Sequence, residues 1–367
     1  MTRVLSVSSS RADVGILSPV WAALAATAGV ELDIFLTGMH MGPDAADPGD
    51  AVPGSAKVHR GGADLGGAGG REAADAMGRI GRAAAEVLAT VAPDVMLVIG
   101  DRLDMLPAAM AALPFGVPMV HLHGGEVTEG AIDNRIRHAL SQLADAHCVS
   151  SEDARDRLIS MGIDGASITV TGAPGLDTLR AAPVLDPSEF ATRVGLPPDR
   201  PFRLVTVHPE TTAPDPLAPL AAILGALAER PGPVLFTAPN SDPGGAEARR
   251  RILDFCETAD EAVFVDTLGP LYPSALRNAA LMLGNSSSGV IEAGVFGLPV
   301  LDVGDRQTGR LHGANVVRLS SEPDQIVTAL DRLGAVPVKA AAGSPYGDGA
   351  AGPRVAGVVI DTGRRRQ

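Results

Sequence analysis

Acids, bases and hydroxyls that could bind an anion or move a proton gather at the ends of predicted strands. The stretch 284–294 follows an apolar run at 279–283 and places Ser286, Ser287 and Ser288 where a helix is expected to begin. Free backbone N–H groups and the helix dipole at such a terminus favour negative charge. Glu292, one turn later, suits a ligand that presents hydroxyls, such as a ribose. An ordinary serine-rich N-cap is the alternative explanation.

Similar polar groups follow other predicted strands or open other predicted helices. They are Arg11 and Asp13; Asp101, Arg102 and Asp104; His121, His123 and Glu126; Asp133, Arg135, Arg137 and His138; His208 and Glu210; Asn240 and Asp242; and Arg306 and Arg310. Each has a structural alternative when taken singly; Asp133, for example, could cap the helix that follows it. Together they predict a site in which acids, bases and guanidinium groups converge.

The elements that must position these groups alternate along the chain. Short β-rich runs and longer Ala/Leu-rich helical patterns are typical of βαβ units around parallel sheets. Strands are expected at 4–8, 31–36, 94–99, 117–122, 203–207, 234–237, 262–265, 279–283 and 300–303. Helices are expected at 17–28, 72–91, 132–144, 217–229, 246–257, 323–333 and 351–361, and a long loop at 42–70.

This alternation predicts an α/β protein of two doubly wound domains that face each other across a cleft. The expected domains are 1–180 and 181–350, joined by a Pro-rich, charged segment at 181–201. Residues 351–367 are expected to form a C-terminal helix and tail that pack back on the first domain. Ligands of such sheets bind beyond the carboxyl ends of the strands, which is where the polar groups fall.

Composition argues against several classes of function. A net charge of -13 and an aromatic content of 3% disfavour binding to nucleic acid or to anionic membranes. Cys148 and Cys256 form no metal-spaced motif, and His121 and His123 are expected on one strand face without further ligands, so no metal site is expected. No signal peptide is visible, nor the ~20 apolar residues of a membrane helix, and a reduced, cytoplasmic protein is expected.

Many of these residues stand in longer motifs that run in order through nearly the whole chain. In the first half these are Ser10-Arg11-Ala12-Asp13, Gly100-Asp101-Arg102-Leu103-Asp104, His121-Leu122-His123-Gly124-Gly125-Glu126 and Ala131-Ile132-Asp133-Asn134-Arg135-Ile136-Arg137-His138. In the second half they are Val207-His208-Pro209, Pro239-Asn240-Ser241-Asp242, the stretch 284–294, Gly304-Asp305-Arg306-Gln307-Thr308-Gly309-Arg310 and Tyr346-Gly347-Asp348-Gly349. In these motifs the chain resembles the UDP-N-acetylglucosamine 2-epimerase family, specifically its hydrolysing branch in sialic-acid and related nonulosonic-acid synthesis.

The resemblance implies two Rossmann-like domains, as in GT-B glycosyltransferases, and no cofactor. It implies that UDP leaves C1 as C2 loses a proton, giving a 2-acetamidoglucal, and that water then adds to release the free manno-configured sugar. The substrate would be UDP-N-acetylglucosamine or UDP-N,N′-diacetylbacillosamine, and a homodimer or homotetramer is expected. Catalytic roles fall to Asp101, Asp133, His208 and His123. UDP-binding roles fall to Arg11, Arg102, His208, Asn240, Ser286, Ser287, Gly289, Glu292 and Arg306, and sugar-binding roles to Glu126 and Arg310.

The chain departs from the family pattern at a few positions. His123 stands where many relatives carry a carboxylate, so its role is open between a general acid or base and a hydrogen-bonded residue at a strand end. Asn134 replaces an acid, and Gly15 replaces a serine of animal homologues. Which of Asp101 and Asp133 is the acid and which the base is also open.

Three other functions share parts of this pattern. A non-hydrolysing epimerase would return a UDP-linked product, and a retaining glycosyltransferase of the same fold would release UDP only when an acceptor is present. A nucleotide-sugar sensor would bind the substrate without turning it over.

Overall fold

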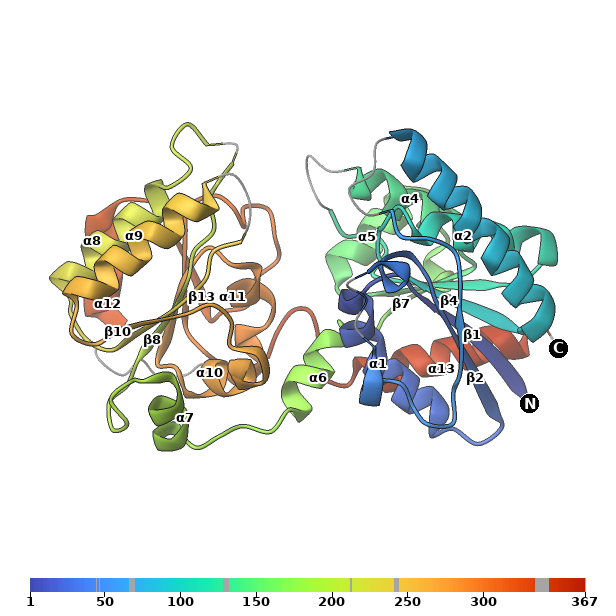
Figure 1. Ribbon diagram of the computed structural model, residues 1–367, viewed down its shortest axis with the longest axis horizontal. Coiled ribbons are helices and arrows are strands. Elements are labelled where there is room, and N and C mark those ends of the chain that lie inside the picture. Colours follow the sequence, from blue (N-terminus) through green and yellow to red (C-terminus); the bar gives the residue numbers. More distant parts are fainter. Residues whose placement is uncertain are drawn as a thin grey trace. The chain divides into compact units, whose positions relative to one another are not determined.

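The chain forms two compact units in the computed structural model (Figure 1), which describes residues 1–43, 45, 47–65, 70–127, 132–211, 213–240, 244–333 and 343–366. Unit 1 contains Met1–Thr178 and Tyr346–Gln367, and unit 2 contains Leu179–Pro345. The C-terminal helix α13 (Ala351–Arg364) returns to unit 1 and packs along α1 (Arg11–Ala25). A Cβ at Gly352 would lie 2.8 Å from the Pro19 carbonyl oxygen, so this close helix contact requires glycine.

Unit 1 is built on a seven-stranded parallel sheet in the order β3-β2-β1-β4-β5-β6-β7. Its strands are β1 (Thr2–Ser8), β2 (Val30–Leu36), β3 (Lys57–Arg60), β4 (Val95–Ile99), β5 (Met119–Leu122), β6 (Ala146–Val149) and β7 (Ile168–Val170). Its further helices are α2 (Gly70–Val91), α3 (Met105–Ala112), α4 (Asp133–Leu143) and α5 (Glu152–Ser160), and α6 (Gly175–Ala181) leads into unit 2.

Unit 2 is built on a six-stranded parallel sheet in the order β10-β9-β8-β11-β12-β13. Its strands are β8 (Arg203–Thr206), β9 (Val234–Thr237), β10 (Ala262–Val265), β11 (Leu281–Gly284), β12 (Val300–Val303) and β13 (Val316–Leu319). Its helices are α7 (Pro187–Val194), α8 (Ala218–Glu229), α9 (Gly245–Thr258), α10 (Tyr272–Asn278), α11 (Ser287–Ile291) and α12 (Pro323–Leu333).

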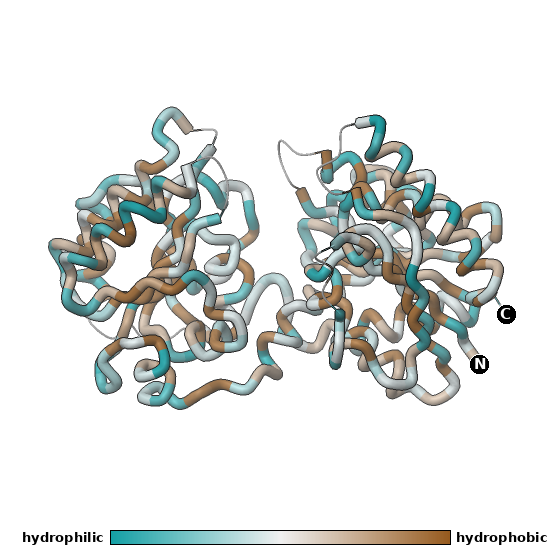
Figure 2. The backbone as a smooth tube through the Cα atoms, viewed as in Figure 1, coloured by the Kyte–Doolittle hydropathy of each residue, from teal (hydrophilic) through white to brown (hydrophobic). Residues whose placement is uncertain are grey.

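Apolar strands covered by helices explain both units. The central strands β1, β4 and β5 are almost entirely buried, as expected for parallel strands with helices on both faces. Helix α2 is amphipathic: its Ala76, Ile80, Ala84 and Leu88 recur every four residues and are buried. Figure 2 shows the matching alternation of hydrophilic and hydrophobic residues along α2 and α9. The prediction of an α/β protein with two doubly wound domains is confirmed.

Two predictions of local structure in unit 1 are wrong. The expected loop at 42–70 contains the strand β3, which pairs with β2 at the edge of the sheet. β3 was missed because three of its four residues are polar, as an edge strand allows; residues 66–69 of this loop lie outside the described part. The helix expected from 17 begins at Arg11, because Ser10 and Asp13 form a capping box, in which each side chain bonds the backbone N–H of the other.

Unit 2 contains two local features whose bounds the sequence did not predict. The joining segment 181–201 contains α7, whose N-cap Asp186 accepts hydrogen bonds from the Ser188 and Glu189 N–H groups. Phe190 of α7 is fully buried in the unit 2 core, so this segment belongs to the domain. The helix after β11 is a single short element, α11, followed by a 3-10 turn over Ala293–Phe296.

Within the described residues, no helix combines the length and the apolar character that crossing a bilayer requires.

Candidate active site

In each sheet the order in which strands are added reverses at one point. The predicted site residues follow the two strands on either side of that point. In unit 1 the order reverses between β1 and β4, and in unit 2 between β8 and β11. Connections that leave neighbouring strands toward opposite faces open a crevice at the carboxyl edge, where doubly wound proteins bind ligands. Arg11 and Asp101 follow β1 and β4, whereas His208 and Ser286 follow β8 and β11.

The loop after β1 is held by Asp13. Its Oδ2 atom accepts hydrogen bonds from the Ser9 N–H (2.7 Å), the Ser9 hydroxyl (2.9 Å) and the Ser10 N–H (3.0 Å). Asp13 is therefore a structural residue. Arg11, the first residue of α1, is exposed. The helix dipole opposes a cation at this position, so the stability of the helix does not explain Arg11, whereas an anionic ligand would.

Asp101 lies beside the buried Arg137, which belongs to α4. Arg137 Nη2 donates to Asp101 Oδ2, and the two side chains are 6% and 23% exposed. Burial raises the pKa of the Asp101 carboxyl above its ordinary value, and the charges of Asp133 and Glu126 raise it further, against the opposing effect of Arg137. A carboxyl with a raised pKa is suited to hold and deliver a proton.

Asp133 does not cap its helix with its side chain. It is the first residue of α4, and the N-cap position is taken by Ile132 without a side-chain hydrogen bond. The Asp133 side chain is half-buried. Its negative charge raises the pKa of Asp101, so the two carboxylates are close enough to interact electrostatically. This geometry leaves Asp133 available to a ligand rather than to the helix.

Arg102 is held within unit 1. Its guanidinium donates to Asp104 Oδ1 (3.1 Å) and Oδ2 (2.8 Å) and to the Ser9 hydroxyl (3.2 Å). Asp104 is fully buried, and a Cβ at Gly38 would lie 2.5 Å from its Oδ2 atom. The pair therefore ties the loop after β4 to the loop after β1.

His123 ends the turn out of β5 in an unusual backbone conformation. Its φ of 65° lies in the left-handed region, which non-glycine residues seldom adopt. The Nδ1 atom is 2.7 Å from Glu126 Oε1, which also accepts the Ser150 hydroxyl at 2.7 Å. Burial alone would raise the pKa of Glu126, but His123, Ser150 and Arg137 lower it to about 2.

His121 is a structural residue of β5 and does not share a strand face with His123, which lies beyond the strand. It is fully buried; its Nε2–H donates to the Gly100 carbonyl (2.9 Å), and its Nδ1 accepts from the Ser141 hydroxyl (3.0 Å). Burial lowers the pKa of His121 to about 3. Among the described residues, no group of three or more His, Cys, Asp or Glu side chains is placed to hold a metal ion.

His208 follows β8 and is fixed by two asparagines. Its Nδ1 accepts the Asn240 backbone N–H at 3.0 Å, so the hydrogen of the neutral ring must lie on Nε2, which is therefore a donor. The Asn285 side chain accepts the His208 N–H (2.7 Å) and donates to the His208 carbonyl (2.9 Å). Asp242 of the same predicted group lies outside the described residues.

The serine stretch after β11 forms the N-terminus of α11. The Ser286 hydroxyl is the N-cap and lies 3.0 Å from the Ser288 hydroxyl. Gly289 has a packing role, because a Cβ there would lie 3.0 Å from Val300 Cγ1 on β12. Glu292 accepts a hydrogen bond from the Tyr272 hydroxyl of α10. Burial raises the pKa of Glu292, an effect that this hydroxyl opposes.

The turn after β12 carries Arg306 and Arg310, both exposed. Glu210, from the loop after β8, accepts the Asp305 N–H (2.8 Å) and the Arg306 N–H (2.9 Å) through Oε1. Gln307 Nε2 donates to the Asn285 carbonyl at 2.9 Å. These bonds fix the backbone of the turn, and the Arg306 guanidinium also donates to the Asn285 carbonyl at 3.4 Å.

Several residues that organise the two edges did not stand out in the sequence. Asn285 and Ser150 bind other loops through side-chain hydrogen bonds that span 77 and 24 positions of sequence. Asn285 and Ser150 each stand directly after a buried strand, and this position is the sequence feature that could have identified them. Tyr272 opens a helix after a proline-containing turn and carries no such signal.

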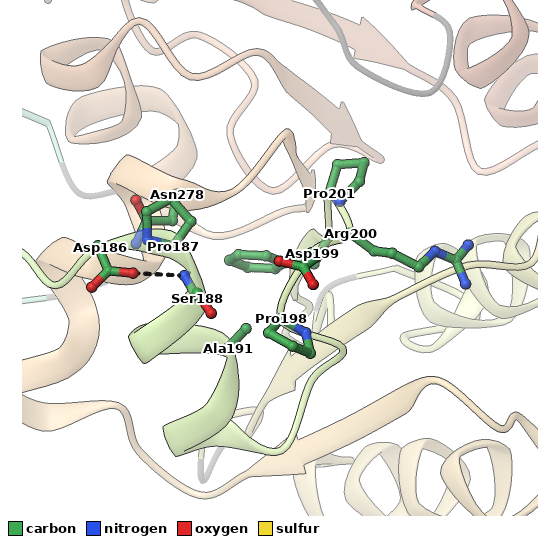
Figure 3. A pocket seen from close by; sticks show the side chains of 10 residues that line it. Asp186, Pro187, Ser188, Ala191, Pro198, Asp199, Arg200, Pro201 and Asn278 are labelled. Carbon is green, nitrogen blue, oxygen red and sulfur yellow. Dashed lines mark hydrogen bonds between the residues drawn. The ribbon is translucent and has the colours of Figure 1, made fainter.

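A separate hollow of about 400 Å³ lies on unit 2 between α7 and the loop 198–202 (Figure 3). Its wall includes Pro187, Pro198 and Pro201, and its Asp186 is already engaged as the N-cap of α7. None of the predicted site residues lines it, and it is distinct from the carboxyl edge.

Comparisons with known proteins agree with one another. A family model described as UDP-N-acetylglucosamine 2-epimerase matches residues 22–360. The UDP-N,N′-diacetylbacillosamine 2-epimerase (hydrolyzing) of Legionella pneumophila is 34% identical over 351 residues, 95% of this chain and 92% of that protein. The GDP/UDP-N,N′-diacetylbacillosamine 2-epimerase (hydrolyzing) of Campylobacter jejuni is 32% identical over 247 residues, 66% of this chain and 63% of that protein. The crystal structure of UDP-GlcNAc 2-epimerase from Neisseria meningitidis bound to UDP-GlcNAc superimposes with a TM-score of 0.76 at 19% identity, covering 98% of this chain and 100% of that one, which shows a common fold.

Proposed function

Because this chain belongs to the UDP-N-acetylglucosamine 2-epimerase family, we propose that it is a hydrolysing UDP-sugar 2-epimerase. It converts UDP-N,N′-diacetylbacillosamine or UDP-N-acetylglucosamine into the free manno-configured sugar and UDP. The likeness to two hydrolysing diacetylbacillosamine epimerases supports testing the first substrate before the second. The reaction proceeds by loss of UDP to a 2-acetamidoglucal, followed by hydration.

The division of chemistry between the two carboxyl edges is the observation that carries the proposal. Unit 2 supplies the donors for a departing diphosphate: the Nε2–H of His208, the Ser286 and Ser287 turn and the guanidinium of Arg306. Asn240 assists through the N–H that orients His208, and Glu292 takes the ribose hydroxyls. Gly289 keeps α11 close to β12, which places the serine turn. Unit 1 adds Arg11 and Arg102 as cations for the nucleotide.

Proton transfer belongs to unit 1. Asp101, whose pKa is raised, and Asp133 belong to the group that acts on the sugar, where C2 loses one proton and gains another. His123 and Glu126 complete this group, and Arg310 binds the sugar. Two carboxyls in different surroundings can divide acid and base roles between them, which inversion at C2 requires.

One assay separates this function from its alternatives. The full chain is incubated with each UDP-sugar in D₂O without an acceptor. Free manno-configured sugar with deuterium at C2, together with UDP, is the expected result. A UDP-linked product would instead indicate a non-hydrolysing epimerase, and UDP release only with an acceptor would indicate a glycosyltransferase. Binding without turnover of either sugar would indicate a sensor.

We also propose a cytoplasmic location and a homodimer or homotetramer. The nucleotide-sugar substrate supports the first, and the family resemblance supports the second. Light scattering on the purified full chain tests the oligomer, and a monomer at micromolar concentration would contradict it.

A further inference from the structure

His123 is held in a conformation that costs energy. A left-handed φ is strained for a non-glycine residue and persists only where the surroundings enforce it. Here the His123 N–H donates to the Cys148 carbonyl at 3.0 Å, which ties the residue to β6. The turn beyond is equally tight, because a Cβ at Gly125 would lie 2.2 Å from the Ala154 carbonyl oxygen. The fold therefore fixes where the imidazole lies.

Glu126 fixes the position of the proton on that imidazole. Its pKa of about 2 leaves the carboxylate ionised at neutral pH, so it can only accept a hydrogen bond. The hydrogen in the 2.7 Å contact must therefore lie on His123 Nδ1, and the neutral ring carries a lone pair on Nε2. Ser150 donates to the same carboxylate oxygen of Glu126 at 2.7 Å, which holds the carboxylate in place. Arg137 donates to the backbone carbonyl of Glu126 at 2.8 Å and fixes the backbone there.

The other ring nitrogen of His123, Nε2, has no hydrogen-bond partner among the described residues. This nitrogen is buried, although the side chain as a whole is 15% exposed. A buried polar atom without a partner is rare in native proteins, and at a functional site it marks a place that a ligand completes. Arg137 bonds both Asp101 and the Glu126 backbone, so this nitrogen belongs to the same edge as Asp101.

These contacts divide the acid and base roles that the sequence leaves open. Resting on the function proposed above, we propose that His123 Nε2 is the base of the elimination step and that Glu126 is its positioning residue. The C2–H bond breaks and its electron pair forms the C1=C2 double bond. The C1–O bond to UDP breaks, UDP leaves with the electron pair of the C1–O bond, and the proton moves to Nε2. The Glu126 carboxylate then stabilises the imidazolium, as the aspartate of a Ser-His-Asp triad does for its histidine.

The alternative role of Glu126 as a sugar contact makes a different prediction, and a double-mutant cycle separates the two. Glu126→Gln removes the charge behind the histidine while keeping the side-chain shape, and we expect kcat to fall about a hundredfold with KM little changed. In His123→Glu, a carboxylate replaces the imidazole as the base, and we expect a kcat at least tenfold above that of His123→Ala. In the His123→Glu background, Glu126→Gln then changes kcat less than about threefold, because no imidazolium remains to be stabilised.

The acid limb of the pH profile provides a second measurement. An imidazole loses its basic form between about pH 8 and 5, whereas a carboxylate remains basic to lower pH. The acid limb of kcat therefore moves to lower pH in His123→Glu. Glu152→Gln is the matched control, since Glu152 opens α5 with a side chain that is 71% exposed, and its kcat and pH profile stay unchanged.

The tautomer itself is measured without substrate. The full chain is labelled with ¹⁵N-histidine, and His123→Ala identifies the His123 signals. We expect the hydrogen on Nδ1 at pH 8 in the native protein and a mixture of tautomers in Glu126→Gln. A hydrogen on Nε2, an equal loss from Glu126→Gln in both backgrounds, or a His123→Glu as slow as His123→Ala would each overturn the proposal. A native protein that turns over neither UDP-sugar would instead overturn the proposed function, whatever the tautomer.

Discussion

At the carboxyl edge of the unit 2 sheet the proposed ligand contacts are hydroxyls and exposed arginines, whereas at the edge of the unit 1 sheet carboxylates lie beside a buried arginine. Unit 2 presents the serines before α11 and the exposed Arg306. Unit 1 presents Asp101 and Asp133, and its buried Arg137 is paired with Asp101. The proposed function therefore assigns anion binding to one edge and proton transfer to the other, although both sheets have the same switch-point topology.

The same contrast appears in the two histidines. His208 in unit 2 receives a backbone N–H on Nδ1 and presents Nε2 as a donor. His123 in unit 1 gives its Nδ1 hydrogen to Glu126 and presents Nε2 as an acceptor. The His208 ring can therefore donate a hydrogen bond to a departing phosphate, and the His123 ring can accept a proton from the sugar. The neighbour at Nδ1 decides which role each ring can perform.

The largest expected effect comes from Asp101→Asn in unit 1. An amide can neither hold nor deliver the proton, so we expect turnover to fall about a hundredfold or more, the usual scale of general acid–base catalysis. UDP affinity, measured by calorimetry, should remain near that of the native protein, because Asp101 is not among the groups proposed to bind the nucleotide. Asp153→Asn, an exposed residue of α5, is the control. Near-normal turnover in Asp101→Asn would remove Asp101 from the chemistry.

The next largest effect tests whether unit 2 is a prearranged anion site. Asn285→Ala leaves the His208 N–H and carbonyl without their side-chain partner. Leaving such groups unsatisfied costs about 1–3 kcal/mol each, so we expect a loss of roughly 2 kcal/mol and a weaker Kd for UDP. In thermal melts this is about 4–8 °C for a unit of this size.

Asn315→Ala is the matched control for that loss. Asn315 is also buried and lies just before β13, at the amino edge of the same sheet. Its side-chain Nδ2 donates to the Leu298 carbonyl at 2.9 Å. It should lower the melting temperature without weakening the affinity for UDP. Equal losses of affinity in both variants would mean that Asn285 acts through stability alone.

The sequence predicted β9, β10 and β12 of unit 2 with the observed bounds, but it did not predict β13. It also placed Asp101, His208 and the serine turn at strand ends, because an apolar run followed by polar residues is a local pattern. The side-chain contacts between residues at different strand ends could not be predicted. Arg137 meets Asp101 across 36 positions, and Asn285 meets His208 across 77, contacts that only the folded sheets create. The edge strand β3 lacks an apolar run and was missed for that reason.

A smaller effect is expected from Arg306→Ala. A hydrogen bond to a charged group is worth about 1.5–3 kcal/mol when it is shielded from water, and Arg306 is exposed, so we expect UDP affinity to fall about tenfold. The loss should shrink as salt is added, because exposed charges are screened. Arg251→Ala on α9 removes the same charge away from the carboxyl edge and should leave Kd unchanged. A fall in kcat at saturating substrate without a change in UDP affinity would assign Arg306 to the chemistry instead.

The smallest effect concerns Asp302, a carboxylate buried at the end of β12 beneath the Arg306 turn. Burial raises its pKa from 3.8 to about 6, although Arg318, whose Nε atom lies 3.8 Å from Oδ2, and His312 oppose the shift. Between these two values the folded protein holds a proton that the unfolded chain has released. This contribution to stability is therefore complete below pH 3.8 and is lost as the pH rises through about 6.

Asp302→Asn removes the charge that is costly above pH 6 but still buries a polar group, so we expect a net gain of about 1 kcal/mol at pH 8, or 2–4 °C in Tm. The gain should vanish at pH 4, where the native carboxyl is protonated. Asp260→Asn, an exposed residue, should show no such pH dependence. If Asp302→Asn instead lowers Tm at pH 8, the ionised carboxylate stabilises the turn through Arg318. In that case the edge of unit 2 depends on a buried carboxylate, as that of unit 1 does, and the contrast between the two edges would hold only for the groups that face the ligand.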